Sequence, residues 1–253
     1  MSEAPVALIT GSGRDRLGSQ IARGLAEDGF RIVVHYHSSS ESAEGLVDEL
    51  TLAGAEAIAI QADVSSEEEV RQMISRVVKH WGQLSVLVNT ASVWEQKTLE
   101  KVRAADLQKH FDVDLKGTFL CSQWAGLQMA KQASGGAIVT FSDWAIGRPY
   151  PGHAAYFSVK GAIPTLTRAL ARELAERNPK VRVNCIQPGP VLLPPDADAS
   201  ERQTLTESTL VRQVDRPDSI VQAVRYLIGD DFITGVCLPV DGGRSIFAQG
   251  EDR

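Results

Sequence analysis

Short apolar segments alternate with helix-like segments along most of this 253-residue chain, and that alternation limits the folds open to it. The segments expected to form strands are 6–10, 31–36, 56–61, 84–89, 137–141 and 181–186. Helical spacing marks the segments between and after them, at about 18–29, 41–53, 66–80, 105–132, 154–177 and 218–228. Strands connected through helices lie parallel, and helices then cover both faces of the sheet. The pattern therefore predicts an α/β protein with a parallel sheet and helices on both faces.

Two local signals refine this outline. Residues 187–208 (QPGPVLLPPDADASERQTLTES) are rich in Pro, Asp and Ser. Their apolar residues follow neither the helical nor the strand spacing, so we expect a loop over the carboxyl edge of the sheet. Ser66, with Glu69 three residues later, predicts a capping box that starts the third helix. Because no repeat, low-complexity tract or linker divides the chain, we expect residues 1–253 to form one domain.

Composition excludes several classes of partner. The formal net charge is −6, which argues against a basic surface for nucleic acid. No apolar run approaches the ~20 residues that span a bilayer, and the first residues do not resemble a signal peptide. Cys121, Cys185 and Cys237 lack disulfide or zinc spacing, so we expect no metal site and a cytoplasmic location. A small-molecule substrate remains the expected partner.

The first expected strand leads directly into a glycine-rich loop, TGSGRDRLGSQIA (10–22). Its glycines at 11, 13 and 18 separate the strand from an amphipathic helix. In that context, backbone N–H groups at the helix start can hold a pyrophosphate. The loop therefore predicts a dinucleotide cofactor, and the alternative is a glycine-rich turn that binds no ligand.

The end of the second strand indicates which dinucleotide binds. NAD-selecting domains usually place an acidic residue there, ~20 residues after the glycine loop, to hold the ribose 2′-hydroxyl. Here VVHYHSSSESAEG (33–45) has no acid before Glu41. His37, Ser38 and Ser39 can instead bind a 2′-phosphate, with Arg16 of the glycine loop reaching the same group. We therefore expect NADPH, although a Ser-rich helix cap is the alternative.

Asp63, at the end of the third strand, is a candidate acceptor for the adenine amino group. A loop aspartate that precedes a helix is nearly as good an explanation.

Tyr156 and Lys160 are four residues apart, one turn on a helix face, and Asp143 precedes the tyrosine by thirteen positions. A phenol has a pKa near 10 and exchanges protons poorly at neutral pH. A nearby ammonium group stabilises the phenolate, so we expect Lys160 to lower the pKa of Tyr156 and to make it a proton donor for a hydride-accepting substrate. By itself such a pair usually has no function, but an upstream nucleotide loop favours this interpretation.

Taken together, the motifs resemble those of the short-chain dehydrogenase/reductase family over nearly the whole chain. The matching segments are TGSGRDRLG (10–18), ADV (62–64), NTA (89–91), YFSVK (156–160), QPGP (187–190) and ITGVCLPVDGG (233–243). The resemblance implies a single-domain Rossmann fold with a seven-stranded parallel sheet and helices on both faces. It also implies a homotetramer with the C-terminal strand at an interface. It implies that Tyr156 is the catalytic acid and that Lys160 tunes it and holds the nicotinamide ribose. The remaining implied cofactor contacts are Gly11, Arg16, Leu17, Gly18, Asp63, Val64, Asn89, Ala91, Pro188 and Gly189.

Departures from the common family pattern are informative. Asp143 stands where most members have Ser, and Ser142 is no easy substitute because adjacent strand residues point to opposite faces. Asp114 replaces the usual Asn, which puts the water relay through that Asn in doubt. The glycine loop is one residue longer than usual and carries Arg16 where glycine is typical.

Several of these departures resemble the pteridine reductases and the similar dihydromonapterin reductases. Shared features are the Asp at 143, the Arg in the glycine loop, the HYHSSS segment (35–40) and ASVW (91–94). The resemblance implies that Trp94 stacks on a pterin, that Ser92 contacts it, and that Asp143 hydrogen-bonds Tyr156 and the substrate. Ser38 and Thr90 depart from the subgroup, and core packing is the alternative role for Trp94.

Electrostatics favours the same substrate class. Reducing a ketone builds negative charge on oxygen, and an ionised carboxylate about 4 Å away would cost about 4 kcal/mol. Reducing a C=N bond leaves a nitrogen that must gain a proton, and a carboxylate can orient N–H groups there. A protonated Asp143 would weaken this distinction, since it can donate as Ser does.

The sequence therefore predicts NADPH-dependent reduction of a pterin or related C=N heterocycle. A carbonyl reductase, such as a 3-oxoacyl-[acyl-carrier-protein] reductase, and a non-catalytic NADP(H) sensor remain as alternatives.

Overall fold

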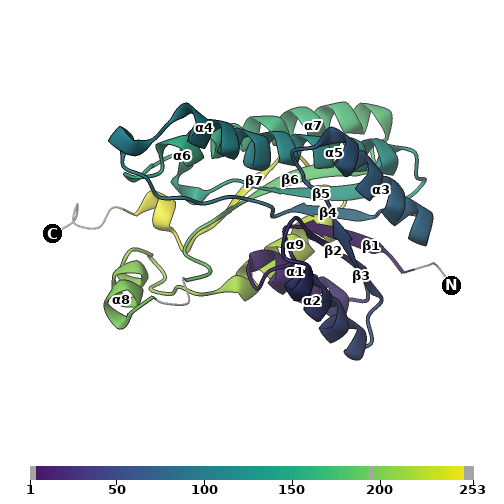
Figure 1. Ribbon diagram of the computed structural model, residues 1–253, viewed down its shortest axis with the longest axis horizontal. Coiled ribbons are helices and arrows are strands. Elements are labelled where there is room, and N and C mark those ends of the chain that lie inside the picture. Colours follow the sequence, from purple (N-terminus) through teal and green to yellow (C-terminus); the bar gives the residue numbers. More distant parts are fainter. Residues whose placement is uncertain (1–3, 194–196, 248–253) are drawn as a thin grey trace.

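A parallel sheet of seven strands forms the centre of the computed structural model, which describes residues 4–193 and 197–247 (Figure 1). The strand order is β3-β2-β1-β4-β5-β6-β7, and every adjacent pair is parallel. The strands are β1 (Val6–Thr10), β2 (Arg31–Tyr36), β3 (Ala57–Gln61), β4 (Val86–Asn89), β5 (Gly136–Phe141), β6 (Val181–Pro188) and β7 (Cys237–Val240). The predicted Rossmann fold is confirmed, including the seventh strand.

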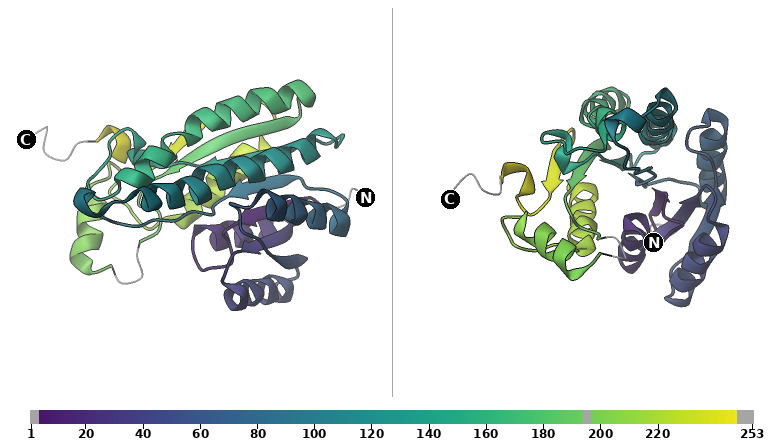
Figure 2. Two further views of the ribbon diagram at one scale, coloured as in Figure 1. Left: turned by 45° about the horizontal axis from the view of Figure 1, so that its top comes forward. Right: turned by 60° about the vertical axis from the view of Figure 1, so that its left-hand side comes forward.

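Helices cover both faces of the sheet, as expected (Figures 1 and 2). The helices are α1 (Leu17–Glu27), α2 (Ser40–Leu52), α3 (Glu67–Trp81), α4 (Ala104–His110), α5 (Gly117–Ala130), α6 (Ala154–Lys160), α7 (Ile163–Arg177), α8 (Ala199–Glu207) and α9 (Pro217–Gly229). Because side chains alternate along a strand, Leu8 belongs to the core under α3, α5 and α7, whereas Ile9 belongs to the core under α1, α2 and α9. Each face of the sheet therefore has its own apolar core.

The strand order reverses between β1 and β4, where Thr10 pairs with Asn89. In open α/β sheets a crevice forms outside the carboxyl ends of the strands at such a point. The glycine loop follows β1, and the segments that contain His37, Asp63 and Ala91 follow β2, β3 and β4. The topology therefore gathers the predicted cofactor residues at one edge of the sheet.

Two helices predicted as continuous are interrupted, so those predictions were wrong in detail. The expected helix 105–132 consists of α4, a π-helical turn (Phe111–Lys116) and α5. The expected helix 154–177 is divided into α6 and α7. The cause of the second break is Pro164, which has no N–H to donate to the carbonyl of Lys160 four residues earlier. That carbonyl instead accepts a hydrogen bond from the hydroxyl of Ser142 at 2.8 Å.

The prediction that 187–208 is a structureless loop was also wrong, because α8 lies within it. Asp198 caps this helix by accepting a hydrogen bond from the N–H of Glu201 at 2.8 Å. Residues 194–196 of the same segment lie outside the described residues. The predicted cap of α3 is confirmed, since the Ser66 hydroxyl accepts from the N–H of Glu69. The Glu69 carboxylate, however, binds the N–H of Asp63 instead of returning to Ser66.

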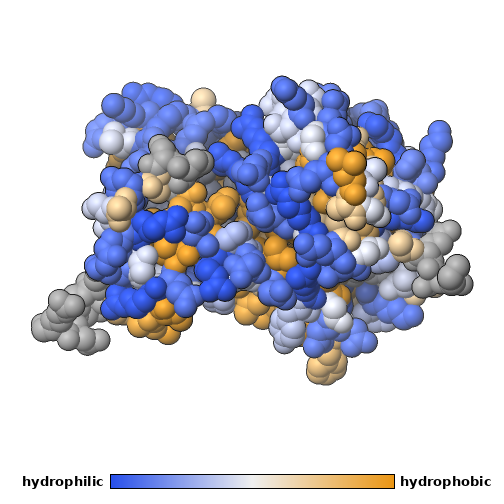
Figure 3. Space-filling view, turned by 90° about the horizontal axis from the view of Figure 1, so that it is seen from below, coloured by the Kyte–Doolittle hydropathy of each residue, from blue (hydrophilic) through white to orange (hydrophobic). Residues whose placement is uncertain are grey.

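Polar side chains cover most of the face seen from below in Figure 1, and apolar side chains show there in several separate groups (Figure 3). Among the described residues, no helix is both long and apolar enough to cross a bilayer. Within the same residues, no group of three or more His, Cys, Asp or Glu side chains is placed to hold a metal ion.

Candidate active site

Tyr156 and Asp143 form a hydrogen-bonded pair at the carboxyl edge of β5. The Tyr156 hydroxyl donates to Oδ2 of Asp143 at 2.9 Å, and the tyrosine is 6% exposed. The other carboxylate oxygen, Oδ1, accepts from the N–H of Ala145 at 2.8 Å. Both oxygens are thus engaged, which fixes the carboxylate against the phenol. The predicted proximity of residue 143 to Tyr156 is confirmed, and the buried Ser142 hydroxyl binds the Lys160 carbonyl instead.

Lys160 lies one helical turn from Tyr156 and is buried. Its ammonium nitrogen is 5.7 Å from the centre of the Tyr156 ring. It donates to the Phe141 carbonyl at 3.1 Å and lies 3.4 Å from Oδ1 of Asp114. Lys160 is therefore close to the phenol, but part of its charge is compensated by a second carboxylate.

The net shift of the Tyr156 pKa is upward, opposite to the decrease expected from Lys160. Burial raises the pKa of Tyr156 well above its ordinary value, and the charge and hydrogen bond of Asp143 raise it further. Asp114 acts on the Tyr156 pKa in the same direction. The phenol thus stays protonated at neutral pH, so it is in the form required of a proton donor. Burial also raises the pKa of Asp143, against the opposing effects of its hydrogen bonds and of Lys160.

Asp114 is completely buried in the π-helical turn and joins three side chains. Its carboxylate contacts the Lys160 ammonium, the Nδ1 atom of His110 at 3.1 Å, and the hydroxyl of Ser92. Single π-helical turns often occur at functional sites, because they shift one side chain out of helical register. Sequence reasoning placed Ser92 at the substrate and missed His110, whose spacing of four residues from Asp114 was the available signal.

Trp94 stacks on His153, with ring centres 4.9 Å apart and an angle of 14° between the rings. Trp94 is 53% exposed, so the alternative that it packs in the core is wrong. His153 is buried, its Nδ1 atom has no hydrogen-bond partner among the described residues, and its ring also contacts Tyr150 and Tyr156. The exposed tryptophan therefore continues an aromatic group that includes Tyr156.

The geometry of the glycine loop is suited to binding a cofactor that carries phosphate groups. Gly11 has φ +69°, and a Cβ there would lie 2.7 Å from the Cα of Ala91. The first turn of α1 leaves the N–H groups of Leu17 and Gly18 without a protein acceptor in the described part of the chain. These free donors at a helix N-terminus match the pyrophosphate of a dinucleotide.

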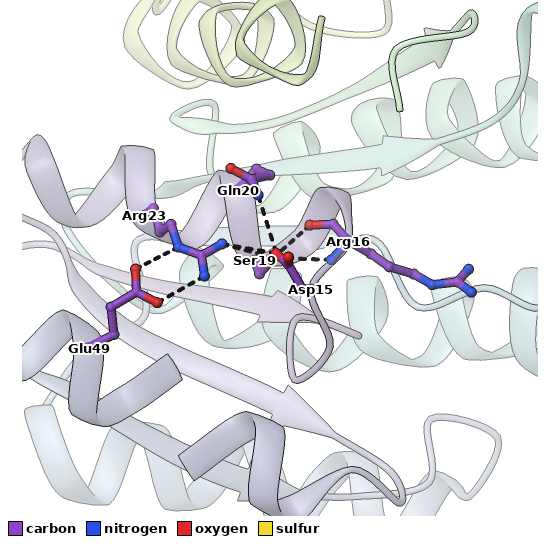
Figure 4. A network of polar contacts seen from close by, with 6 residues as sticks. All are labelled: Asp15, Arg16, Ser19, Gln20, Arg23 and Glu49. Carbon is purple, nitrogen blue, oxygen red and sulfur yellow. Dashed lines mark hydrogen bonds and ion pairs between the residues drawn. The ribbon is translucent and has the colours of Figure 1, made fainter. Parts of the chain in front are cut away.

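Side chains of α1 and α2 hold this loop in place (Figure 4). Arg23 forms two hydrogen bonds with the carboxylate of Glu49, at 2.7 and 2.9 Å, and contacts Asp15 at 3.3 Å. Ser19 accepts from the N–H of Arg16 at 3.1 Å. The Arg16 guanidinium points away from Arg23 and Glu49 (Figure 4) and is exposed, which leaves it available to an anionic ligand.

The other predicted cofactor residues lie where the strands end. His37 and Ser38 are exposed after β2, and Ser39 precedes the first residue of α2. Asp63 accepts from the N–H of Ser65 at 2.8 Å and Val64 is buried. On the other side of the crevice, the side-chain amide of the buried Asn89 donates to the Ser122 hydroxyl at 3.0 Å. Pro188 is the last residue of β6, and Gly189 follows it.

His35, which lies between the glycine loop and the end of β3, was not identified from the sequence. It is 2% exposed. Its Nδ1 accepts from the N–H of Gly11 at 2.9 Å, so its Nε2 donates to the carbonyl of Ala62 at 3.0 Å. One neutral imidazole therefore connects the glycine loop to the end of β3.

This burial predicts acid sensitivity. Burial lowers the pKa of His35 to about 4, although the Ala62 carbonyl opposes the shift. The imidazole is neutral in both states above pH ~6.5, but below that only the unfolded chain gains the proton readily. Stability should therefore fall between pH ~6.5 and pH 4, by about 2 to 3 kcal/mol at pH 4.5 from this group alone.

Urea unfolding at pH 7.5 and pH 4.5 checks this expectation. His35→Gln should be less stable than the wild type at pH 7.5 but should lose about 2 to 3 kcal/mol less on acidification. Equal losses in the two proteins would show that His35 does not cause the acid sensitivity.

A family model described as "Enoyl-(Acyl carrier protein) reductase" matches residues 14–245 of the chain. Among curated proteins, an uncharacterised oxidoreductase of Methylorubrum extorquens is 36% identical over 248 residues, which cover 95% of this chain and 98% of the relative. A 3-oxoacyl-[acyl-carrier-protein] reductase of Staphylococcus aureus is 38% identical, with 94% of this chain and 96% of the relative covered.

Solved structures are also similar to this chain over nearly its whole length. A mutant of a short-chain dehydrogenase/reductase from Serratia marcescens is 31% identical, with a TM-score of 0.86 and coverage of 95% of this chain and 98% of that one. A chain described as a short-chain alcohol dehydrogenase from Sinorhizobium meliloti is 30% identical, with a TM-score of 0.88 and 98% of both chains covered.

Proposed function

Since the chain belongs to the short-chain dehydrogenase/reductase family, we propose that it is an NADPH-dependent reductase of a pterin or a related C=N heterocycle. Membership of the family makes it an oxidoreductase. The observation that supports a pterin or a related C=N heterocycle as the substrate is the hydrogen bond of 2.9 Å between Tyr156 and Asp143.

The chemistry that bound NADPH supplies is a hydride. Tyr156, protonated at neutral pH, donates its proton to the substrate nitrogen next to the carbon that is reduced. Each oxygen of an ionised carboxylate can accept a second hydrogen bond, so Asp143 also accepts from an N–H group of the substrate ring and orients it. Trp94, stacked on His153 and more than half exposed, offers an aromatic surface for the flat ring, with Ser92 two residues earlier in the same segment.

The cofactor would be held by the groups that follow β1 to β4 and β6. The N–H groups of Leu17 and Gly18 bind its pyrophosphate, with Gly11 allowing close approach. Arg16, His37, Ser38 and Ser39 bind the 2′-phosphate. At the adenine end lie Asp63 and Val64, and at the nicotinamide end lie Asn89, Ala91, Lys160, Pro188 and Gly189.

Removing the Arg16 guanidinium should change the cofactor preference. We expect Arg16→Ala to lower kcat/KM for NADPH by about 10- to 100-fold, the value of one charged hydrogen-bonded contact, and to leave the value for NADH nearly unchanged. Steady-state kinetics with both cofactors measures this. Arg71→Ala on α3, whose arginine pairs with Glu68, is the matched control and should change neither value. Equal rates with NADPH and NADH in the wild type would contradict the proposal.

A carbonyl reductase is the second candidate, and two observations favour it. The Staphylococcus aureus relative is named as a 3-oxoacyl-[acyl-carrier-protein] reductase. Burial also raises the pKa of Asp143, and a protonated carboxyl can donate to a ketone oxygen as serine does.

Parallel assays of NADPH oxidation with dihydrobiopterin, dihydrofolate and an acetoacetyl thioester discriminate between the candidates. Turnover of a pterin supports the proposal. Turnover of the thioester alone would support the carbonyl reductase. NADPH binding without turnover of any substrate would indicate a sensor.

We also propose a homotetramer with β7 at an interface. β7 is an edge strand of the sheet, and such edges are commonly covered by a partner. Light scattering of the purified protein tests the number of subunits.

A further inference from the structure

A pocket of about 210 Å³ lies beside the Tyr156–Asp143 pair. Its lining residues are Trp144, Arg148, Tyr150, Ser208, Arg244 and Phe247. Trp144 directly follows Asp143, and Trp144 and Tyr150 pack against the cluster that contains Tyr156. A molecule reduced at Tyr156 can therefore extend into this pocket. The lining includes two arginines and no acidic residue, although the whole chain carries a net charge of −6.

Arg244 is the central cation of the pocket. Its guanidinium lies 4.4 Å from the centre of the Trp144 ring, an arrangement in which cation–π attraction fixes the plane of the group. The residue is partly buried, and burial lowers its pKa. A guanidinium has five N–H donors, and none of those of Arg244 has a hydrogen-bonded partner in the described parts of the chain.

Among the described residues, the two carboxylates whose charges act on Arg244, Asp143 and Asp241, are both held by other donors. Asp241 accepts from the N–H of Gly243 at 2.9 Å through one oxygen and from the N–H of Ser245 at 2.6 Å through the other. Asp143 accepts from Ala145 and Tyr156 through its two oxygens. Neither carboxylate is in ion-pair contact with Arg244, so the partly desolvated charge of Arg244 is left for a ligand.

Arg148 adds a second positive charge at the rim of the pocket. It is exposed, and its Nη1 donates to the Phe247 carbonyl at 2.7 Å. That bond anchors the side chain on the segment that carries Arg244. Among the described residues, the other N–H groups of Arg148 have no acceptor and can reach a ligand.

We infer that this pocket is a subsite for a carboxylate carried by the substrate, and that Arg244 determines the preference for the acid. A guanidinium fixed over an aromatic ring presents its N–H edge to a carboxylate and can form two parallel hydrogen bonds. The inference rests on the proposed reductase centre at Tyr156 but not on which bond is reduced. It narrows the substrate class to molecules with an acidic group a short distance from the reduced bond.

Pairs of similar ligands, one with a carboxylate and one with an uncharged group in its place, test the inference. The binding of pterin-6-carboxylate and of 6-hydroxymethylpterin to the protein with NADPH is measured by calorimetry. Turnover of 4-oxopentanoate and of its methyl ester is measured in parallel. We expect the acid to be preferred by about 10-fold or more in at least one pair, and Arg244→Gln to reduce that preference to about 1.

Two further variants keep the test interpretable. Arg244→Lys retains the charge without the planar fork and should keep part of the preference. Arg172→Gln removes an arginine that is 84% exposed on α7, and it should leave the preference unchanged. An acid preference in the oxo pair, without pterin binding or turnover, would remove the pterin proposal and keep the carboxylate subsite. No acid preference in either pair, or the same preference in Arg244→Gln, would overturn the subsite.

Discussion

Replacing Tyr156 by Phe is expected to lower kcat for reduction by a factor of about 10² to 10⁴, the usual contribution of a positioned proton donor. The substitution removes one oxygen, and the buried ring keeps its contacts with Phe157 and His153. NADPH should therefore still bind to the variant. Stopped-flow measurement of a single turnover with the preferred substrate isolates the chemical step.

Tyr226→Phe is the matched control, because Tyr226 is 55% exposed on α9. It should leave kcat unchanged. A Tyr156→Phe enzyme that binds NADPH and keeps more than about a tenth of the wild-type rate would contradict the role of Tyr156 as proton donor.

Replacing Asp143 by Ser is expected to change specificity. Pterin reduction should fall by about 10- to 100-fold, since the substrate loses a charged hydrogen-bond acceptor. Reduction of a simple ketone should hold or rise, because a carboxylate near the developing alkoxide is replaced by a hydroxyl that can donate to it. The serine hydroxyl can still accept from the N–H of Ala145, so the local turn should persist. Parallel measurement of kcat/KM for both substrates gives the ratio.

The same variant has a pH signature. Burial raises the pKa of Tyr156, and Asp143 raises it further by charge and hydrogen bond. Without the Asp143 carboxylate the Tyr156 pKa should decrease, so reduction should lose its protonated donor at a lower pH than in the wild type. Asp143→Asn, which is uncharged and nearly isosteric, should shift the alkaline limb in the same direction. If both variants keep the wild-type pH profile, Asp143 does not control the protonation of Tyr156.

The parallel sheet could be predicted because its signals are local. Strands with apolar side chains on both faces show as short apolar runs, and the order of elements dictates parallel pairing. The hydrogen bond between Asp143 and Tyr156 was implied by the resemblance to pteridine reductases, and the alternation of strand faces argued against Ser142 in its place.

The errors have identifiable causes. The break before α7 was readable from Pro164 but was overlooked, and α8 was missed because its Asp198 cap was taken as part of a polar loop. The sign of the Tyr156 pKa shift was wrong because burial is a tertiary property and Asp114 approaches from another helix. His35 and Arg244 act through contacts with residues distant in sequence, so no spacing rule could reveal them.

A crystal structure of the protein with NADPH and a pterin tests most directly whether Asp143 selects the substrate. We expect a carboxylate oxygen of Asp143 within about 3 Å of a ring N–H group and the Tyr156 hydroxyl at a similar distance from a ring nitrogen. A pterin bound elsewhere, or an Asp143 side chain turned more than about 4 Å from both the ring and Tyr156, would contradict this selection and leave carbonyl reduction as the better account.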